Sequence, residues 1–169
     1  MDRLELLGEH LERASGEGWA WLCKRLSAND TGLTGSHQVG FYLPSDLARS
    51  VAPELDTRTP NPRRQYEFRL ISHNRLARPS LIFYNNRFTV PGGTRDEYRM
   101  TGFSGCKDVL QDPAAVGSLL FLAFSPIDNT AIGWLARTPE EAELIQLVAG
   151  PVSANGKVAR LLRPRSAST

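Results

Sequence analysis

Residues 24–45 read KRLSANDTGLTGSHQVGFYLPS, in which a long polar segment lies between Leu26 and the apolar run VGFYLP. The polar part, residues 27–38, holds the Ser, Asn, Asp and Gly side chains that favour turns and loops. Before it, WAWLCKR at 19–25 alternates Trp19, Trp21 and Cys23 with less apolar residues, which is the period of a strand. After it, VGFYLP at 39–44 is typical of a returning strand. The pattern predicts two strands joined by a long polar loop.

The remaining chain adds more short strands and a few helices. Helical spacing or start signals predict helices over 3–14, from Ser45 to Pro53, and from the TPEE capping box at Thr138 to Gly150. Apolar alternation or apolar runs predict strands at 65–70, 81–86, 119–125, 131–137 and 157–162. The predicted strands and helices do not alternate regularly, as they would in a doubly wound sheet. We therefore expect a mainly β (α+β) domain over 1–165, a seven-stranded open or pseudo-barrel with short helices at its ends, and a disordered tail at 166–169.

The amino-acid composition limits the classes of protein to which this chain can belong. The chain has 169 residues, 41% of them hydrophobic, which is enough for one buried core. No apolar run approaches the roughly 18 residues that cross a bilayer, so we expect a soluble, cytoplasmic protein. Two isolated cysteines, Cys23 and Cys106, cannot form a disulfide framework and are expected to be reduced and structural.

The basic residues are seventeen arginines and three lysines, and they are unevenly placed. Residues 58–99 hold nine arginines against three acids, whereas residues 1–57 and 100–150 are each net acidic. A basic middle between acidic flanks can face a phosphate backbone on one side. A GC-rich genome that favours arginine codons is the alternative explanation.

Signals for catalysis are weak. A metal-dependent nuclease has an acid two positions before a lysine, but Leu22, Gly105 and Asn155 precede the three lysines at that distance. His10, on an expected helix surface, and His73, in a basic loop, lie in different contexts, and no GxSxG or phosphate-binding glycine loop is present. We expect no catalytic residue, no metal site and no cofactor in this chain.

Two polar loops are the candidate functional residues. Loop one, residues 27–38, and the strand end before it carry Lys24, Arg25, Ser27, Asn29, Asp30, Thr31, Thr34, His37 and Gln38. Loop two, residues 87–99, carries Arg87, Thr94, Arg95, Asp96, Glu97, Tyr98 and Arg99. Such donors and acceptors suit the reading of base edges in the major groove, where arginine pairs with guanine and a carboxylate accepts from cytosine. The alternative is that both are ordinary hydrophilic hairpin connections.

The acids inside loop two bear on this choice. A surface that only attracts phosphate gains nothing from Asp96 and Glu97. Acids are useful where a loop reads cytosine, or where they fix the rotamers of its own arginines.

Two segments resemble the N-terminal domains of EcoRII-like type IIE restriction endonucleases, which recognise CC(A/T)GG. They are Lys24–Ser45 and YNNRFTVPGGTRDEYRMTGFSGC at 84–106, and LQDP at 110–113 continues the similarity. The resemblance implies a DNA-binding pseudobarrel like that of plant B-three domains, with loops one and two as two arms that grip DNA from the major groove. It places Arg87, Glu97, Tyr98 and Arg99 at contact positions.

The family implies that such a domain binds an effector copy of the site and relieves autoinhibition of a separate catalytic domain, which alone would need Mg²⁺. That catalytic domain is absent from this sequence. Tyr98 stands where the family pattern has a lysine, and the PGG at 91–93 changes the shape or length of the second arm.

Three functions are therefore compared: a bacterial effector domain that reads CC(A/T)GG, a regulator or modified-DNA reader with the same barrel and another target, and a nuclease in its own right. The partner in the first two is double-stranded DNA. The isolated domain is expected to be a monomer, since two arms around one duplex need no second subunit.

Overall fold

The structure is a computed structural model and describes residues 1–33 and 40–162. Its strands are β1 (Ala20–Arg25), β2 (Phe41–Leu43), β3 (Arg63–Gln65), β4 (Glu67–Leu70), β5 (Arg75–Ala77), β6 (Ser80–Tyr84), β7 (Glu97–Thr101), β8 (Leu119–Phe124), β9 (Thr130–Leu135) and β10 (Lys157–Arg160). Its α-helices are α1 (Arg3–Gly16), α2 (Ser45–Val51), α3 (Asn86–Thr89), α4 (Lys107–Leu110) and α5 (Pro139–Ala149). Short 3-10 helices are η1 (Pro53–Leu55), η2 (Ile71–His73), η3 (Ser104–Cys106) and η4 (Pro113–Ala115).

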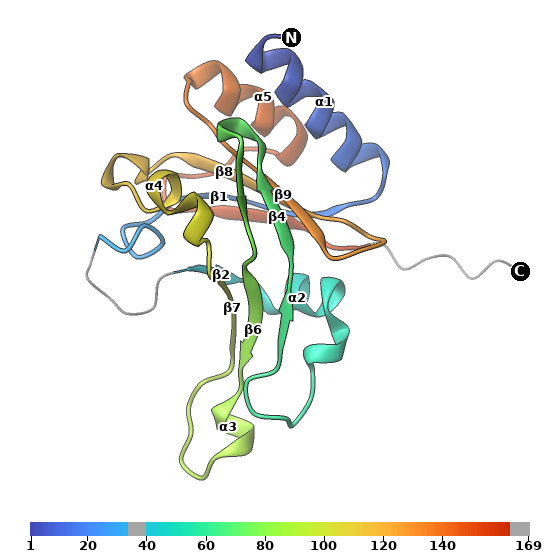
Figure 1. Cartoon of the computed structure of the whole chain (residues 1–169), viewed down its shortest axis with the longest axis vertical. Helices are drawn as coiled ribbons and strands as arrows, with labels where there is room; N and C mark the ends of the chain where they lie inside the picture. The colour runs from blue at the N-terminus through green and yellow to red at the C-terminus, as the bar shows by residue number, and fades with distance from the viewer. Residues whose placement is uncertain (34–39, 163–169) are drawn as a thin grey trace, which may run out of the picture.

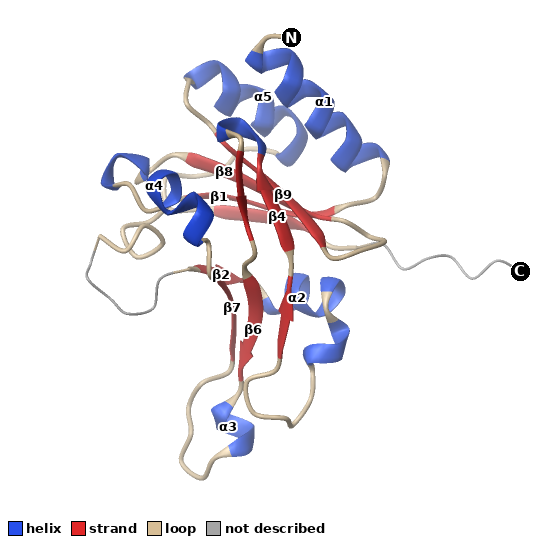
Figure 2. Cartoon of the chain, viewed as in Figure 1, coloured by secondary structure: helices blue, strands red, loops and turns tan. Residues whose placement is uncertain are grey.

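The strands form two sheets that face each other across the core (Figure 1; Figure 2). The six-stranded sheet has the order β10-β1-β8-β9-β4-β5, and the four-stranded sheet has the order β2-β7-β6-β3. The expected mainly β class with a few helices is confirmed. Within the described residues there are ten strands rather than seven, and neither sheet closes into a barrel.

The strands β1, β8 and β9 form the centre of the larger sheet, and β8 and β9 form the hairpin predicted from 119–137. Every residue of β8 is buried, because both faces of this sheet are covered. In β1, Trp21 and Cys23 pack toward α1 and α5, while Ala20 and Leu22 pack toward the other sheet. The less apolar residues of the predicted alternation are therefore as buried as the tryptophans.

The strand predicted at 65–70 is divided between the two sheets, which corrects the sequence analysis. β3 pairs with β6 in the smaller sheet, whereas β4 pairs in parallel with β9 and antiparallel with β5 in the larger sheet. The chain changes sheet at Tyr66, whose amide donates to the carbonyl of Pro79. Sequence alternation continues through this residue, so the change of partner leaves no local signal.

Helices α1 and α5 pack together on the outer face of the six-stranded sheet (Figure 1). Asp2 and Glu5 form a complete capping box at the start of α1. At α5 the predicted box is only half formed, because Thr138 accepts from the amide of Glu141 but the Glu141 carboxylate turns inward. It accepts from the Trp134 indole at 3.0 Å and pairs with Arg3 at 2.7 Å.

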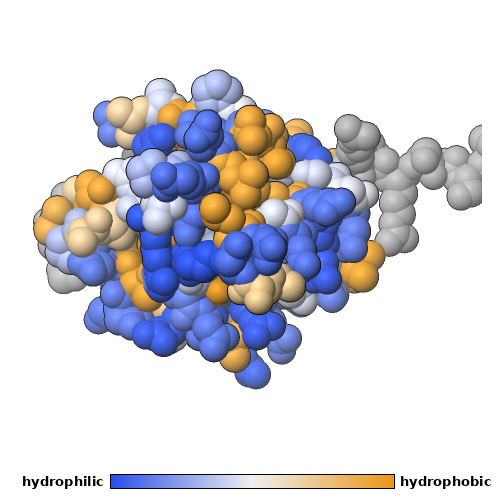
Figure 3. Space-filling view, turned by 90° about the horizontal axis from the view of Figure 1, so that it is seen from above, coloured by the Kyte–Doolittle hydropathy of each residue, from blue (hydrophilic) through white to orange (hydrophobic). Residues whose placement is uncertain are grey.

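The helix layer has an apolar patch near the centre of its outer surface (Figure 3). Exposed apolar side chains on α1 and α5 include Leu4, Leu147 and Val148. No helix within 1–33 and 40–162 is long and apolar enough to span a membrane.

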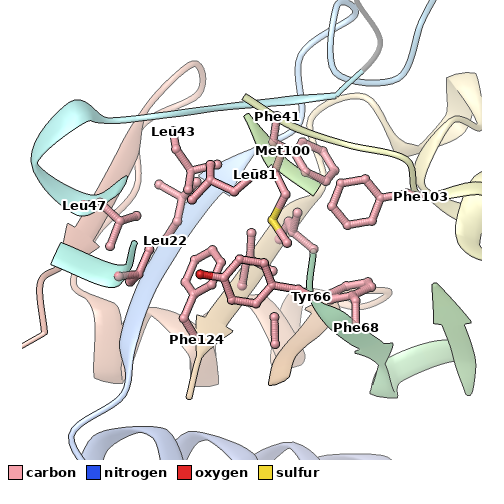
Figure 4. Packing of buried hydrophobic residues seen from close by; sticks show 14 of the residues in the cluster. Leu22, Phe41, Leu43, Leu47, Tyr66, Phe68, Leu81, Met100, Phe103 and Phe124 are labelled. Atoms are coloured by element: carbon pink, nitrogen blue, oxygen red, sulfur yellow. The ribbon is translucent and has the colours of Figure 1, made fainter. Parts of the chain in front are cut away.

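The main core fills the space between the two sheets (Figure 4). It is built from Leu22, Phe41, Leu43, Leu47, Tyr66, Phe68, Leu81, Met100, Phe103 and Phe124, among others. Cys23 and Cys106 are both buried and unpaired, as the sequence predicts for structural thiols.

The connections on both sides of β7 contain short helices. Between β7 and β8 lie η3, α4 and η4, and α3 begins at Asn86 and extends into the predicted loop two. The predicted tail at 166–169 lies outside the described residues.

Candidate nucleic-acid interface

The outer face of the four-stranded sheet carries three of the loop-two candidates, Arg95, Glu97 and Arg99. In this sheet β7 lies between β2 and β6. Strands β6 and β7 project away from the helix layer, with α3 at their far end (Figure 1). Since side chains alternate along a strand, Glu97, Arg99 and Thr101 face outward. Tyr98 and Met100 face the core.

Glu97 holds two guanidinium groups on this outer face. Its Oε1 accepts from Arg95 Nη2 at 2.7 Å and from Arg99 Nε at 3.1 Å. The Arg95 guanidinium also lies 3.9 Å from the centroid of the Tyr84 ring, in cation–π geometry. We call Arg95, Glu97 and Arg99 the arginine fork.

Burial alone raises the pKa of the Glu97 carboxyl, but the hydrogen bonds and charges of Arg95 and Arg99 outweigh it, and the pKa lies below its ordinary value. The carboxylate is therefore ionised at neutral pH and fixes both arginines before any ligand arrives. Of the two roles considered for acids in loop two, the structure shows the fixing of arginine rotamers.

Hydrogen bonds within loop two also fix the end of the projecting strands β6 and β7. The amide of Arg95 donates to Asn86 Oδ1 at 2.6 Å, and the amide of Arg87 donates to the carbonyl of Arg95 at 3.1 Å. Arg87 Nη1 lies 3.9 Å from Asp96 Oδ2, and its side chain is 63% exposed. Thr94 is exposed beside it. Loop two is therefore held in a defined conformation by its own hydrogen bonds, and it presents the exposed Arg87 at its end.

The PGG at 91–93 makes this tip possible. Gly92 has φ +77°, and a Cβ on Gly93 would lie 2.1 Å from the carbonyl oxygen of Asn86. Only glycine allows the chain to pass so close to α3. The sequence departure at PGG is therefore a turn that packs against α3.

Several candidates of loop one are structural, which corrects the sequence analysis. Lys24, Asp30 and Thr31 are 9%, 6% and 3% exposed. Lys24 Nζ pairs with Asp30 Oδ2 at 2.7 Å, and the same oxygen accepts from the amide of Ser27 at 2.8 Å. Ser27 Oγ in turn accepts from the amide of Asp30. These side chains fold the first turn of the loop, and Lys24, Asp30 and Thr31 are too buried to be presented to a ligand.

The other candidates of loop one divide into two groups. Arg25 reaches the carbonyls of Val152 and Gly117, both at 3.4 Å, so it joins the loop to the end of the larger sheet. Asn29 is exposed. Thr34, His37 and Gln38 lie outside the described residues.

Tyr98 is the clearest correction in loop two. It is fully buried, and its ring stacks on Phe83 with centroids 4.3 Å apart and planes 7° apart. Burial raises the pKa of its phenol. The position that resembles a contact lysine therefore serves the core here, and the strand period of 97–101 could have indicated it.

The family that matches this chain is described as restriction endonuclease EcoRII, N-terminal, and it matches residues 15–160. The chain belongs to this EcoRII N-terminal family. The type II restriction enzyme EcoRII of Escherichia coli is 34% identical over 137 residues, which cover 76% of this chain and 33% of EcoRII. This chain thus spans about a third of the length of that relative.

A solved structure has a similar fold. It is the B3 domain of the UbaLAI restriction endonuclease, a triple mutant determined with cognate DNA. The TM-score is 0.55 at 19% identity, and the match covers 94% of this chain and 99% of that one. The pseudobarrel expected for the EcoRII N-terminal family is therefore the B3-type arrangement of two open sheets.

The sequence analysis did not identify three residues that lie beside the arginine fork in this EcoRII N-terminal family member. Tyr42 pairs with Arg99 across β2 and β7, and Ile82 flanks Arg99 on the other side. Tyr84 pairs with Glu97. These residues lie in apolar strands, so only the pairing register shows that they share the outer face.

The two described histidines of this EcoRII N-terminal family member, His10 and His73, lie away from the fork. His73 Nε2 accepts from Arg137 Nε at 3.1 Å, so the ring proton is on Nδ1, which donates to Ser72 Oγ at 2.8 Å. Burial, followed by the charge of Arg137, lowers the pKa of His73 to about 4. His10 lies against Trp134, with ring centroids 6.3 Å apart. In residues 1–33 and 40–162, no cluster of three or more His, Cys, Asp and Glu side chains could hold a metal ion.

Proposed function

We propose that this chain binds double-stranded DNA at CC(A/T)GG and reads the major groove with its two arms, as the effector or target-recognition domain of a type IIE restriction endonuclease. The observation that carries the proposal is the arginine fork on the outer face of β7. Two guanidinium groups held by one carboxylate are preorganised, so little side-chain entropy is lost when they meet base edges. Arginine paired with guanine is the commonest specific contact in the major groove.

The comparisons support the same proposal. Membership of the EcoRII N-terminal family indicates the N-terminal part of a restriction enzyme, and the B3-type structure of UbaLAI was determined with cognate DNA. The projecting pair β6 and β7, with Arg87 exposed near its tip, is an element of the size that enters a major groove. Loop one, whose first turn is fixed by Lys24 and Asp30, is the second arm.

The target sequence is tested without bias by selection. The chain is immobilised, and duplexes with a random centre are bound, eluted, amplified and sequenced. Enrichment of CC(A/T)GG supports the proposal. Enrichment of another sequence, or of a methylated duplex only, favours the regulator or modified-DNA reader with the same fold. No enrichment over the input contradicts sequence-specific binding.

We propose that the chain has no nuclease activity by itself and that Mg²⁺ serves a catalytic domain fused to it in a full-length cytoplasmic enzyme. Incubation with plasmid DNA and Mg²⁺ should leave the plasmid supercoiled. The isolated domain should be a monomer, so light scattering should give about the 18.7 kDa of one chain. Plasmid cleavage by the purified chain would show that this domain carries its own active site.

A further inference from the structure

A row of side chains crosses the outer face of the four-stranded sheet from one edge to the other. Pairing places Tyr42 opposite Arg99, Arg99 opposite Ile82, and Ile82 opposite Arg63. Directly paired residues point to the same face of a sheet. Arg63, at the β3 edge, therefore lies on the same face as the arginine fork.

A second cation joins the row at the opposite edge. Lys157 begins β10, an edge strand of the other sheet, and its Nζ lies 4.7 Å from the centroid of the Tyr42 ring. The row thus has Lys157 at one end, Arg63 at the other, and Arg99 between them. No sequence pattern connects these three residues, which come from distant parts of the chain.

The two end cations differ from neighbouring cations in how they are paired. Each is exposed, and neither forms an ion pair with a carboxylate in the part of the chain that the structure describes. Their neighbours differ: Arg64 is bound to Asn129 and Glu54, and Lys24 is bound to Asp30. Burial and then the charge of Lys24 lower the pKa of Lys157, and the more weakly acting charge of Asp30 does not offset them.

Ile82 is the apolar residue between the two arginines of this row. It is only 4% exposed, although it belongs to neither apolar cluster. Its directly opposite neighbours are Arg99 and Arg63, whose aliphatic stems cover apolar surface while their charged ends stay in water.

We propose that Lys157 and Arg63 bind backbone phosphates on the two sides of the groove that the arginine fork reads. β2 and β3 are three strand spacings apart, about 14 Å. The major groove is about 12 Å wide. Cations at both edges therefore lie over the two phosphate backbones while Arg99 faces the floor of the groove. The inference rests on the proposed function and adds contacts outside the two arms.

The test measures the salt dependence of binding for Lys157→Gln and Arg63→Gln, on a CC(A/T)GG duplex and a scrambled duplex. Each lost phosphate contact should lower the slope of log K against log salt by about 0.9. Affinity for both duplexes should fall by the same factor. Arg13→Gln, on α1 in the helix layer, removes the same charge and should leave the slope unchanged.

The outcomes separate this inference from the proposed function. An unchanged slope in both variants, or the same change in Arg13→Gln, overturns the phosphate contacts. If the parent chain shows no preference between duplexes but the two variants still lose slope, the contacts stand and the sequence-specific function fails. If the parent binds neither duplex, both fail. Circular dichroism melts confirm that the variants are folded.

Discussion

At the scale of single residues, the site depends on one carboxylate. Glu97 Oε1 is the acceptor for both Arg95 and Arg99, and no second described carboxylate pairs with either guanidinium. The acid thus stabilises two donors in one geometry. The affinity of this surface for phosphate would be higher without it, but its ability to select bases would be lower.

Glu97→Gln tests this role. The variant should lose about 1–3 kcal/mol of affinity for the cognate duplex, because the fork is no longer fixed. Binding to a scrambled duplex should stay equal or strengthen, since a negative charge is removed. Glu9→Gln on α1 is the matched control. Equal losses on both duplexes would mean that the fork does not read bases.

Tyr66 tests the packing of the core. Its hydroxyl is buried and forms no hydrogen bond within the described chain, and it points into apolar surroundings (Figure 4). A buried hydroxyl without a partner costs about 1–3 kcal/mol. Tyr66→Phe should therefore raise the free energy of unfolding by about 1 kcal/mol in urea denaturation. Tyr84→Phe, on the outer face, should change it by less than about 0.5 kcal/mol. A destabilised Tyr66→Phe would reveal a partner for the hydroxyl.

At the scale of elements, the sequence predicts features that depend on local signals better than features that depend on which distant strands pair. The helix α1 and the hairpin β8–β9 follow from periodicity and capping within a few residues. The division at Tyr66 and the inward position of Tyr98 depend on which strand lies alongside, and β4 pairs with β9 more than sixty residues away.

The candidate site was predicted in part. Arg95, Glu97 and Arg99 do gather on one face, because they lie two residues apart along β7 and the extended chain just before it. The polar residues of loop one looked equally suited to DNA. Burial shows instead that Lys24 and Asp30 stabilise the turn, and composition alone cannot separate a donor that folds a loop from one that meets a base.

Gly93→Ala tests the arm as an element. The added Cβ would collide with backbone at Asn86, so the tip must move away from α3. Cognate affinity should fall at least tenfold, ~1.4 kcal/mol, while the melting temperature changes little, because the tip lies outside both apolar clusters. Gly8→Ala, with no atom within 4 Å of its Cβ, should leave affinity unchanged. Unaltered binding by Gly93→Ala would show that the tip does not touch DNA.

At the scale of the whole molecule, the layers separate stability from recognition. Glu141 of α5 stabilises the helix layer through an ion pair with Arg3 and a hydrogen bond from Trp134. The hydrogen-bonded Ser72 and His73 lie next to it. The arginine fork lies on the other sheet. Changes in the helix layer should therefore alter stability and leave DNA selectivity intact.

The pH dependence of stability tests the contribution of His73 to this layer. The folded pKa of His73, about 4, lies below its ordinary value of 6.5, so the unfolded chain binds a proton more readily. Stability from this residue is present above pH 6.5 and is lost as pH falls toward 4. His73→Gln should flatten the urea midpoint over that window. An unchanged pH profile in the variant would assign the acid sensitivity to other groups.

The central claim is that the folded chain reads a sequence and does not merely attract phosphate. The most direct measurement is a titration into one CC(A/T)GG duplex and a scrambled duplex of equal composition, repeated at several salt concentrations. The account predicts a preference of about a thousandfold or more that persists as salt rises, because base contacts release few counterions. Equal binding to both duplexes that disappears as salt rises would contradict it.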